Sequence, residues 1–254
     1  MDLNSIIIAA ENGGKIVKKY FGEVLEVEEK TTLADFRTKA DTESEKAILQ
    51  VITNRFPDFN ILSEETGLID NKSEYTFVID PLDGSNNFVL GIPNFSISIG
   101  LLKGEKVVVG VIHLPVLNHT YHAQERQGSF LDKKRLHVNK ESNIKKVTVS
   151  YTCGYVNSSE YTERLKHKLN ELGIKRMLEY WSPAVEFCLI ASGKMEAIIN
   201  NKIEIYDYTA GKIIAREAGA LITDFDGKPE NSDKENAFLV SNGTKIHQQL
   251  LEVI

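Results

Sequence analysis

Two carboxylates and a hydroxyl, from Asp80, Asp83 and Ser85, lie within six consecutive residues that also contain Pro81 and Gly84. The apolar segment before them predicts a strand that runs into Asp80, and Pro81, with its fixed φ and missing donor, favours a sharp exit from that strand. Asp83, Gly84 and Ser85 are typical of a helix start, with Asp83 as a candidate capping carboxylate. Carboxylates suit a hard cation, and the N–H groups of a helix start suit a phosphate. On local grounds alone, a plain strand–turn–helix junction explains the segment equally well.

Three segments of the chain resemble the signatures of the inositol monophosphatase family, and they occur in the family order. Residues 80–88 resemble D-P-[IL]-D-G-[ST]-x-N-F, and residues 206–220 resemble W-D-x-A-A-G-x-x-[IL]-x-x-E-A-G-G. The third segment is the acidic pair Glu64-Glu65, which follows a predicted strand. Because three ordered matches are hard to obtain by chance, the resemblance decides against the plain junction.

The fold that this resemblance implies is a layered αβαβα sandwich of the inositol monophosphatase and sugar phosphatase type, a mixture of α+β and α/β parts. Residues 1–142 would form an N-terminal α+β part that carries most of the metal ligands. Residues 143–254 would form a C-terminal α/β part that carries Asp207 and the segments that determine substrate specificity. The two parts would meet at the metal site.

By the same resemblance, Glu64, Asp80, Asp83 and Asp207 are metal ligands, and the backbone carbonyl of Leu82 is a further one. An all-oxygen set of this kind suits Mg²⁺ or Mn²⁺ better than Zn²⁺, which favours His or Cys ligands. Four carboxylates would repel one another strongly without cations between them. We therefore expect two or three Mg²⁺ ions per active site, with Mn²⁺ as a substitute. The alternatives are a solvated loop charge for Glu64 and a helix N-cap for Asp207.

The catalytic residues implied by the resemblance are Asp41, Glu64 and Ser85, which would position the attacking water. For Asp41, a favourable interaction with the helix dipole is the alternative explanation. The N–H groups of Gly84 and Ser85 would hold a phosphate oxygen. The implied reaction is lithium-sensitive hydrolysis of a small phosphate monoester, inositol-1-phosphate or a sugar phosphate, by metal-activated water and without a phosphoenzyme.

Substrate contacts are expected from Ser182, Pro183 and Asn200, together with Asp207. The segment with Trp181 and Pro183 departs from the family pattern G-[ST]-A-A, and Asn200 stands where inositol-cleaving members carry a Glu. These departures leave a histidinol-phosphate or nucleotide 3′-phosphate phosphatase as an alternative. A regulatory protein that acts on RNA or transcription is an alternative of another class.

Composition and charge limit the partners of the protein. An apolar fraction of 42% and a charged fraction of 26% are ordinary for a soluble globular protein. The net charge of −6 argues against nucleic acid as a partner, and no apolar run approaches the roughly 20 residues that span a bilayer. The N-terminus does not resemble a signal peptide, and two cysteines are too few for a disulfide framework. We expect a cytoplasmic protein and, from the resemblance, a homodimer.

Hydrophobic periodicity predicts the elements that must position these residues. Helices are expected at 3–21, 41–56, 159–172, 185–191, 208–218 and, as a short closing helix, after Asn242-Gly243. Strands are expected at 61–63, 75–79, 96–102, 107–113, 120–123, 147–150, 175–178, 196–200, 221–223 and 238–240. Gly13 and Gly14 weaken the prediction of the first helix.

Overall fold

The computed structural model describes the chain except for residues 24–26, 30–35 and 155–158. Its α-helices are α1 (Leu3–Tyr20), α2 (Lys39–Arg55), α3 (Ser85–Val89), α4 (Ser159–Leu172), α5 (Pro183–Ala191), α6 (Ile205–Glu217) and α7 (Ile246–Leu251). The strands of the first half are β1 (Val27–Glu29), β2 (Phe36–Thr38), β3 (Asn60–Ser63), β4 (Gly67–Ile69), β5 (Tyr75–Asp83), β6 (Ser96–Lys103), β7 (Lys106–Leu114), β8 (His119–Gln124), β9 (Gly128–Leu131) and β10 (Lys134–Arg135). Those of the second half are β11 (Thr148–Cys153), β12 (Arg176–Leu178), β13 (Ala197–Asn201), β14 (Leu221–Thr223) and β15 (Ala237–Ser241).

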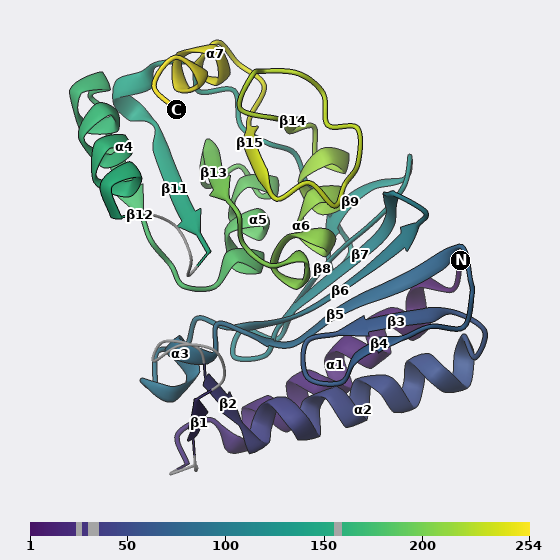
Figure 1. The fold of residues 1–254 in the computed structure, drawn as a ribbon. Coiled ribbons are helices and arrows are strands. Elements are labelled where there is room, and N and C mark those ends of the chain that lie inside the picture. The colour runs from purple at the N-terminus through teal and green to yellow at the C-terminus, as the bar shows by residue number, and fades with distance from the viewer. Residues whose placement is uncertain (24–26, 30–35, 155–158) are drawn as a thin grey trace.

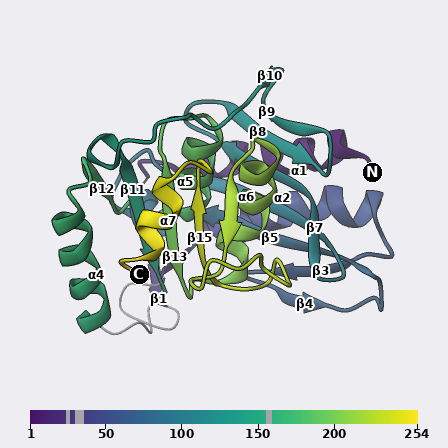
Figure 2. The ribbon, with the colours of Figure 1, turned by 90° about the horizontal axis from the view of Figure 1, so that it is seen from above.

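These elements stack in five layers (Figure 1). Helices α1 and α2 cover one face of an eight-stranded sheet with the order β10-β9-β8-β7-β6-β5-β3-β4. Helices α5 and α6 lie between its other face and a five-stranded sheet with the order β12-β11-β13-β15-β14, and α4 and α7 cover the outer face of that second sheet (Figures 1 and 2). The predicted αβαβα sandwich is thereby confirmed.

The chain passes from the first sheet to the second between β10 and β11, within residues 136–147. Helix α6 comes from the C-terminal half of the chain but packs mainly on β5, β6, β7 and β8. One buried apolar cluster therefore contains residues of both sheets and of the two helices between them. The division at 142/143 stays a prediction.

Close approach of helices explains two of the glycine positions. A Cβ on Gly211 of α6 would lie 2.2 Å from a ring carbon of Phe187 in α5, so only glycine allows the present α5–α6 distance. Similarly, a Cβ on Gly13 of α1 would lie 2.8 Å from the Cδ1 atom of Ile48 in α2. Helix α1 continues through Gly13 and Gly14 because packing outweighs their low helix propensity.

The structure corrects the prediction for the central motif. Strand β5 does not leave the sheet at Pro81 but continues to Asp83, with a register shift against β6 between Asp80 and Asp83. Such an irregularity tolerates a proline, which cannot donate to the ladder. The residue before α3 is Gly84, with φ of +91°, and Asp83 does not cap the helix.

Other element boundaries also differ from the predictions. Helix α6 begins at Ile205, so Asp207 is its third residue and Glu204 its N-cap. Strands β4, β9 and β10 were not predicted, and the polar stretch after the first helix contains β1 and β2. Such short strands carry too few residues to show a period. Among the described residues, no helix combines the length and the apolar character needed to cross a membrane.

Candidate active site

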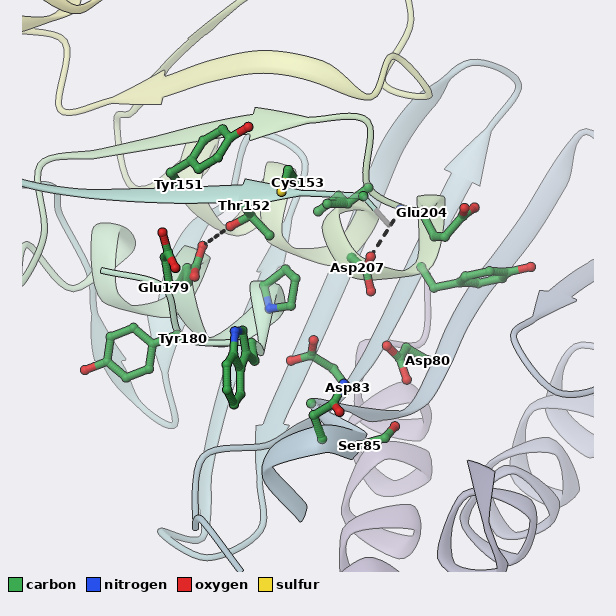
Figure 3. A pocket seen from close by; sticks show the side chains of 18 of the residues that line it. Asp80, Asp83, Ser85, Tyr151, Thr152, Cys153, Glu179, Tyr180, Glu204 and Asp207 are labelled. Atoms are coloured by element: carbon green, nitrogen blue, oxygen red, sulfur yellow. Dashed lines mark hydrogen bonds between the residues drawn. The ribbon is translucent and has the colours of Figure 1, made fainter. Parts of the chain in front are cut away.

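Three aspartates from the two halves of the chain converge at one end of the central layers. Asp80 and Asp83 come from the end of β5, and Asp207 comes from the first turn of α6. One carboxylate oxygen from each of them lies within 4.8 Å of the others. Figure 3 shows the three side chains directed into the same space.

The irregularity in β5 explains why Asp80 and Asp83 serve the same site. In a regular strand, side chains three residues apart point to opposite faces of the sheet. The register shift between these residues removes that constraint, so that both side chains reach the cavity (Figure 3). The Asp80 carboxylate is held by the backbone N–H of Leu82, at 2.9 Å.

Asp83 is held from both halves of the chain. Its Oδ2 accepts hydrogen bonds from Ser96 Oγ, at 2.8 Å, and from Ser182 Oγ, at 2.5 Å. Its Oδ1 is buried and has no hydrogen-bond partner in the described part of the chain. A buried carboxylate oxygen without a partner costs free energy, which a bound cation would offset.

The electrostatics of the cluster also favour a cation. Burial raises the pKa of Asp80 well above its usual range, and the charges of Glu64, Asp83 and Asp207 raise it further. Burial likewise raises the pKa of Asp207 well above its usual range and that of Asp83 to about 6. Each of these shifts disfavours the ionised carboxylate, so a cation bound among the three groups would stabilise their charged forms. Because the donors are all oxygens and one of them is unpartnered, the residues fit Mg²⁺ or Mn²⁺.

The fourth predicted ligand, Glu64, lines the same cavity. It follows β3, and its backbone N–H donates to the carbonyl of Ile79 in β5, at 3.1 Å. Glu45 of α2, which the sequence did not indicate, fixes this loop. Its buried carboxylate accepts a hydrogen bond from the Ser63 hydroxyl. It also accepts hydrogen bonds from the backbone N–H of Thr66, at 3.0 Å, and from the Thr66 hydroxyl, at 2.5 Å.

Asp41 and Ser85 lie together beside the cluster, although they are 44 residues apart in the sequence. Asp41 Oδ2 accepts hydrogen bonds from the backbone N–H of Thr38, at 2.7 Å, and from its hydroxyl, at 2.6 Å. These two residues form the capping box at the start of α2. Its Oδ1 lies 3.3 Å from Ser85 Oγ, which is also 3.0 Å from the carbonyl oxygen of Leu82. Burial raises the pKa of Asp41 to about 6, against the lowering effect of the Thr38 hydrogen bonds. Asp41 therefore combines the capping role with the contact to Ser85.

A cavity of about 670 Å³ opens beside the aspartates. Its wall on the aspartate side includes Glu64, Asp80, Leu82, Asp83, Gly84, Ser85, Asn86 and Asp207. The C-terminal half contributes Tyr151, Thr152, Cys153, Gly154, Thr162, Lys166, Glu179, Tyr180, Trp181, Pro183, Glu186, Ile203, Glu204 and Tyr206 (Figure 3). The volume and the mixed lining suit a small polar ligand.

The predicted substrate contacts are distributed unevenly. Gly84, Ser85 and Pro183 line the cavity, but Ser182 and Asn200 are fully buried and do not. Ser182 instead holds Asp83, and the side-chain amide of Asn200 donates to the carbonyl of Asn236, at 2.8 Å. A direct contact between either of these two residues and the substrate stays a prediction.

Glu186 and Thr152 line the cavity as well, although no motif in the sequence indicates them. Thr152 Oγ1 donates to Glu186 Oε2, at 2.6 Å, as the dashed line from Thr152 in Figure 3 marks. Burial raises the pKa of Glu186 to about 7, although the hydrogen bond from Thr152 lowers it. A signal was present in the sequence, since Glu186 is the only charged residue in the nine residues of α5.

Comparisons with known proteins agree with this geometry. A family model described as "Inositol monophosphatase family" matches residues 3–254. The "Fructose-1,6-bisphosphatase/inositol-1-monophosphatase" of Thermotoga maritima is 35% identical over 242 residues, covering 95% of this chain and 91% of that protein. A "Nus factor SuhB" from Pasteurella multocida is 31% identical over 259 residues, covering 99% and 95% of the two chains. The crystal structure of the extragenic suppressor protein suhB from Bartonella henselae superimposes with a TM-score of 0.92 at 26% identity, covering 98% and 96%.

Proposed function

The chain belongs to the inositol monophosphatase family and is a phosphoric monoester hydrolase, and from this premise we propose that Mg²⁺ is its cofactor. Its substrate is then a small phosphate monoester, inositol-1-phosphate or a sugar phosphate. The observation that carries the proposal is the convergence of Asp80, Asp83 and Asp207 within 4.8 Å, with one buried oxygen of Asp83 left unpartnered. A buried group of carboxylates is costly unless cations are bound.

The metal would be held by Glu64, Asp80, Asp83 and Asp207 and by the carbonyl oxygen of Leu82. When bound, Mg²⁺ lowers the pKa of a water molecule and offsets the charge that develops on the phosphoryl group and the leaving oxygen. Two or three ions would satisfy this set of ligands, and Mn²⁺ would substitute for Mg²⁺ because both prefer oxygen donors.

The remaining residues position the reactants. The Ser85 hydroxyl, held between Asp41 Oδ1 and the Leu82 carbonyl, would orient the attacking water together with Glu64. The backbone N–H groups of Gly84 and Ser85, at the cavity wall, would bind a phosphate oxygen. No side chain needs to form a bond to phosphorus, so no phosphoenzyme is expected.

A substrate panel tests this function. Phosphate release would be measured from inositol-1-phosphate, fructose-1-phosphate, histidinol phosphate and adenosine 3′-phosphate, with Mg²⁺, with EDTA, and with Mg²⁺ plus Li⁺. We expect turnover of at least one ester with Mg²⁺, its loss with EDTA and its inhibition by Li⁺. Turnover that survives EDTA treatment would contradict the metal dependence, and inactivity on every ester would contradict the proposed function.

A second candidate function rests on the relative named Nus factor SuhB, which matches nearly the whole chain. In this alternative, the chain would take part in transcription, with or without phosphatase activity. The net charge of −6 gives little support for direct binding to nucleic acid, so a protein partner would be required. Absence of turnover in the panel would favour this candidate. We also propose a homodimer, which light scattering on the purified protein would test.

A further inference from the structure

Trp181 has a backbone conformation that few residues of its size adopt. It lies between β12 and α5, and its φ is +53°, in the left-handed region that glycine occupies without strain. The family pattern G-[ST]-A-A, which this segment resembles, begins with that glycine. A bulky side chain at this position therefore costs free energy, which the protein has to offset in some other way.

Hydrogen bonds on both sides of Trp181 fix this conformation. The buried side-chain amide of Asn87 donates to the carbonyl of the preceding residue, Tyr180, at 2.7 Å. The hydroxyl of the following residue, Ser182, donates to Asp83 Oδ2, at 2.5 Å. A change to a negative φ at Trp181 would disturb these hydrogen bonds, one of which holds a residue of the aspartate cluster.

The indole side chain of Trp181 gains little from packing. It lies in the wall of the cavity and is 58% exposed. Within the described part of the chain, it takes part in no aromatic stack and in no cation–π pair. Stability therefore does not account for a tryptophan at this position. Strained residues that the surrounding structure holds in place cluster at sites that bind ligands.

The neighbours of Trp181 place its side chain next to the reaction site. Ser182 holds Asp83 and also lies against Gly84, where a Cβ would be 3.1 Å from the Ser182 Cβ. The N–H of Gly84 is one of the two groups proposed to bind the phosphate. Three tyrosines share the cavity wall with the indole, namely Tyr151, Tyr180 and Tyr206. Aromatic side chains thus bound the space that a leaving group would occupy beside the phosphate.

We propose that the cavity also accepts phosphate monoesters whose leaving group carries a planar aromatic or heterocyclic ring, and that the indole of Trp181 stacks on this ring. Stacking between aromatic rings is favourable beyond the burial of their area, and it needs an open ring face of the kind that Trp181 offers. The inference goes beyond the compact polyol and sugar esters of the proposed function but uses the same metal site. The volume of the cavity, about 670 Å³, leaves room for such a ring.

The test compares Trp181→Gly and Trp181→Phe with the wild type on three esters, with Mg²⁺ present. Benzyl phosphate has a planar ring, cyclohexylmethyl phosphate has a puckered ring of the same size, and inositol-1-phosphate represents the proposed function. An ester that is bound but not hydrolysed is measured as a competitive inhibitor of one that is. We expect Trp181→Gly to raise the KM or inhibition constant of benzyl phosphate about threefold to tenfold. The constants of the other two esters, and all those of Trp181→Phe, should stay within about twofold of the wild type.

Unfolding in urea separates this role from a structural one. Because glycine adopts a positive φ without strain, the urea midpoint of Trp181→Gly should equal or exceed that of the wild type. The control is Lys72→Gly, at an exposed residue outside the cavity with a φ of +59°, which should leave the constants of all three esters unchanged.

Several results would overturn the inference and leave the proposed function intact. One is a wild type that hydrolyses inositol-1-phosphate but does not bind benzyl phosphate. Another is a similar rise for all three esters in Trp181→Gly, or a lower urea midpoint, either of which would give the indole a structural role. An unchanged constant for benzyl phosphate would show that the ring does not stack on Trp181. Inactivity of the wild type on all three esters would refute the proposed function and the inference with it.

Discussion

The free energy of unfolding of Glu186→Gln, relative to that of the wild type, should increase as the pH rises. Burial raises the pKa of Glu186 from 4.5 to about 7 in the folded protein. The folded state therefore binds the proton more tightly than the unfolded chain does. The stability that this protonation contributes is fully present below about pH 4.5 and is lost as the pH rises through about 7. A glutamine has no such proton to lose.

The pKa difference sets the size of the effect. A rise from 4.5 to about 7 corresponds to about 3 kcal/mol over the full titration. Between about pH 5 and about pH 8, we expect the free energy of unfolding of the variant, relative to the wild type, to rise by about 2 kcal/mol. The aspartates of the cluster titrate in both proteins, so most of their contribution cancels, and the remainder comes from the charge of Asp83, which also raises the pKa of Glu186.

Urea unfolding of both proteins in EDTA, followed by circular dichroism over this pH range, measures the difference. The exposed Glu171→Gln variant serves as the control and should follow the wild type. A stability difference between Glu186→Gln and the wild type that stays constant with pH would show that the pKa of Glu186 is not raised in the folded protein. Glu186 would then be ionised at ordinary pH in the folded protein, and its burial would carry no proton-linked cost.

Three further substitutions test the positions of the site residues. Ser182→Ala removes a donor to Asp83, and Mn²⁺ affinity measured by electron paramagnetic resonance should fall about tenfold; an unchanged affinity would speak against this link. Gly211→Ala places a methyl group 2.2 Å from the Phe187 ring, and the free energy of unfolding in urea should fall by about 1–3 kcal/mol; full stability would show that α5 and α6 separate easily. Asp41→Asn should lower kcat about a hundredfold in steady-state kinetics with little change in KM, and an unaffected kcat would remove this residue from the mechanism.

Sequence periodicity was sufficient for the long elements of the fold. The α1, α2 and α4 segments each bury a stripe of apolar residues at helical spacing, and their positions agree with the predictions within two residues. The course of β5 was not predictable in this way. Pro81 indicates the end of a strand on local grounds, but pairing with β6 carries the strand on to Asp83. Tertiary pairing therefore outweighed the local preference of proline.

The chemistry of the site was also only partly visible in the sequence. The spacing of Asp80 and Asp83 indicated a cation site, but their meeting with Asp207 was implied by the family resemblance and not by any local pattern. The hydrogen bond from Ser182 to Asp83 and the role of Glu45 beneath the Glu64 loop depend on contacts between distant elements. Such contacts leave no periodic trace in a single sequence.

The role of the aspartate cluster is tested by comparing the wild type with Asp83→Asn. Phosphate release is measured with saturating Mg²⁺, and Mn²⁺ binding is measured for both proteins. We expect the wild type to hydrolyse a monoester, to lose activity in EDTA and to regain it with Mg²⁺. Asp83→Asn removes the carboxylate whose buried oxygen has no hydrogen-bond partner. We expect the kcat of this variant to fall by at least about a hundredfold and its tight Mn²⁺ binding to be lost. Equal activity and equal Mn²⁺ affinity in the two proteins would show that these aspartates do not form a catalytic metal site.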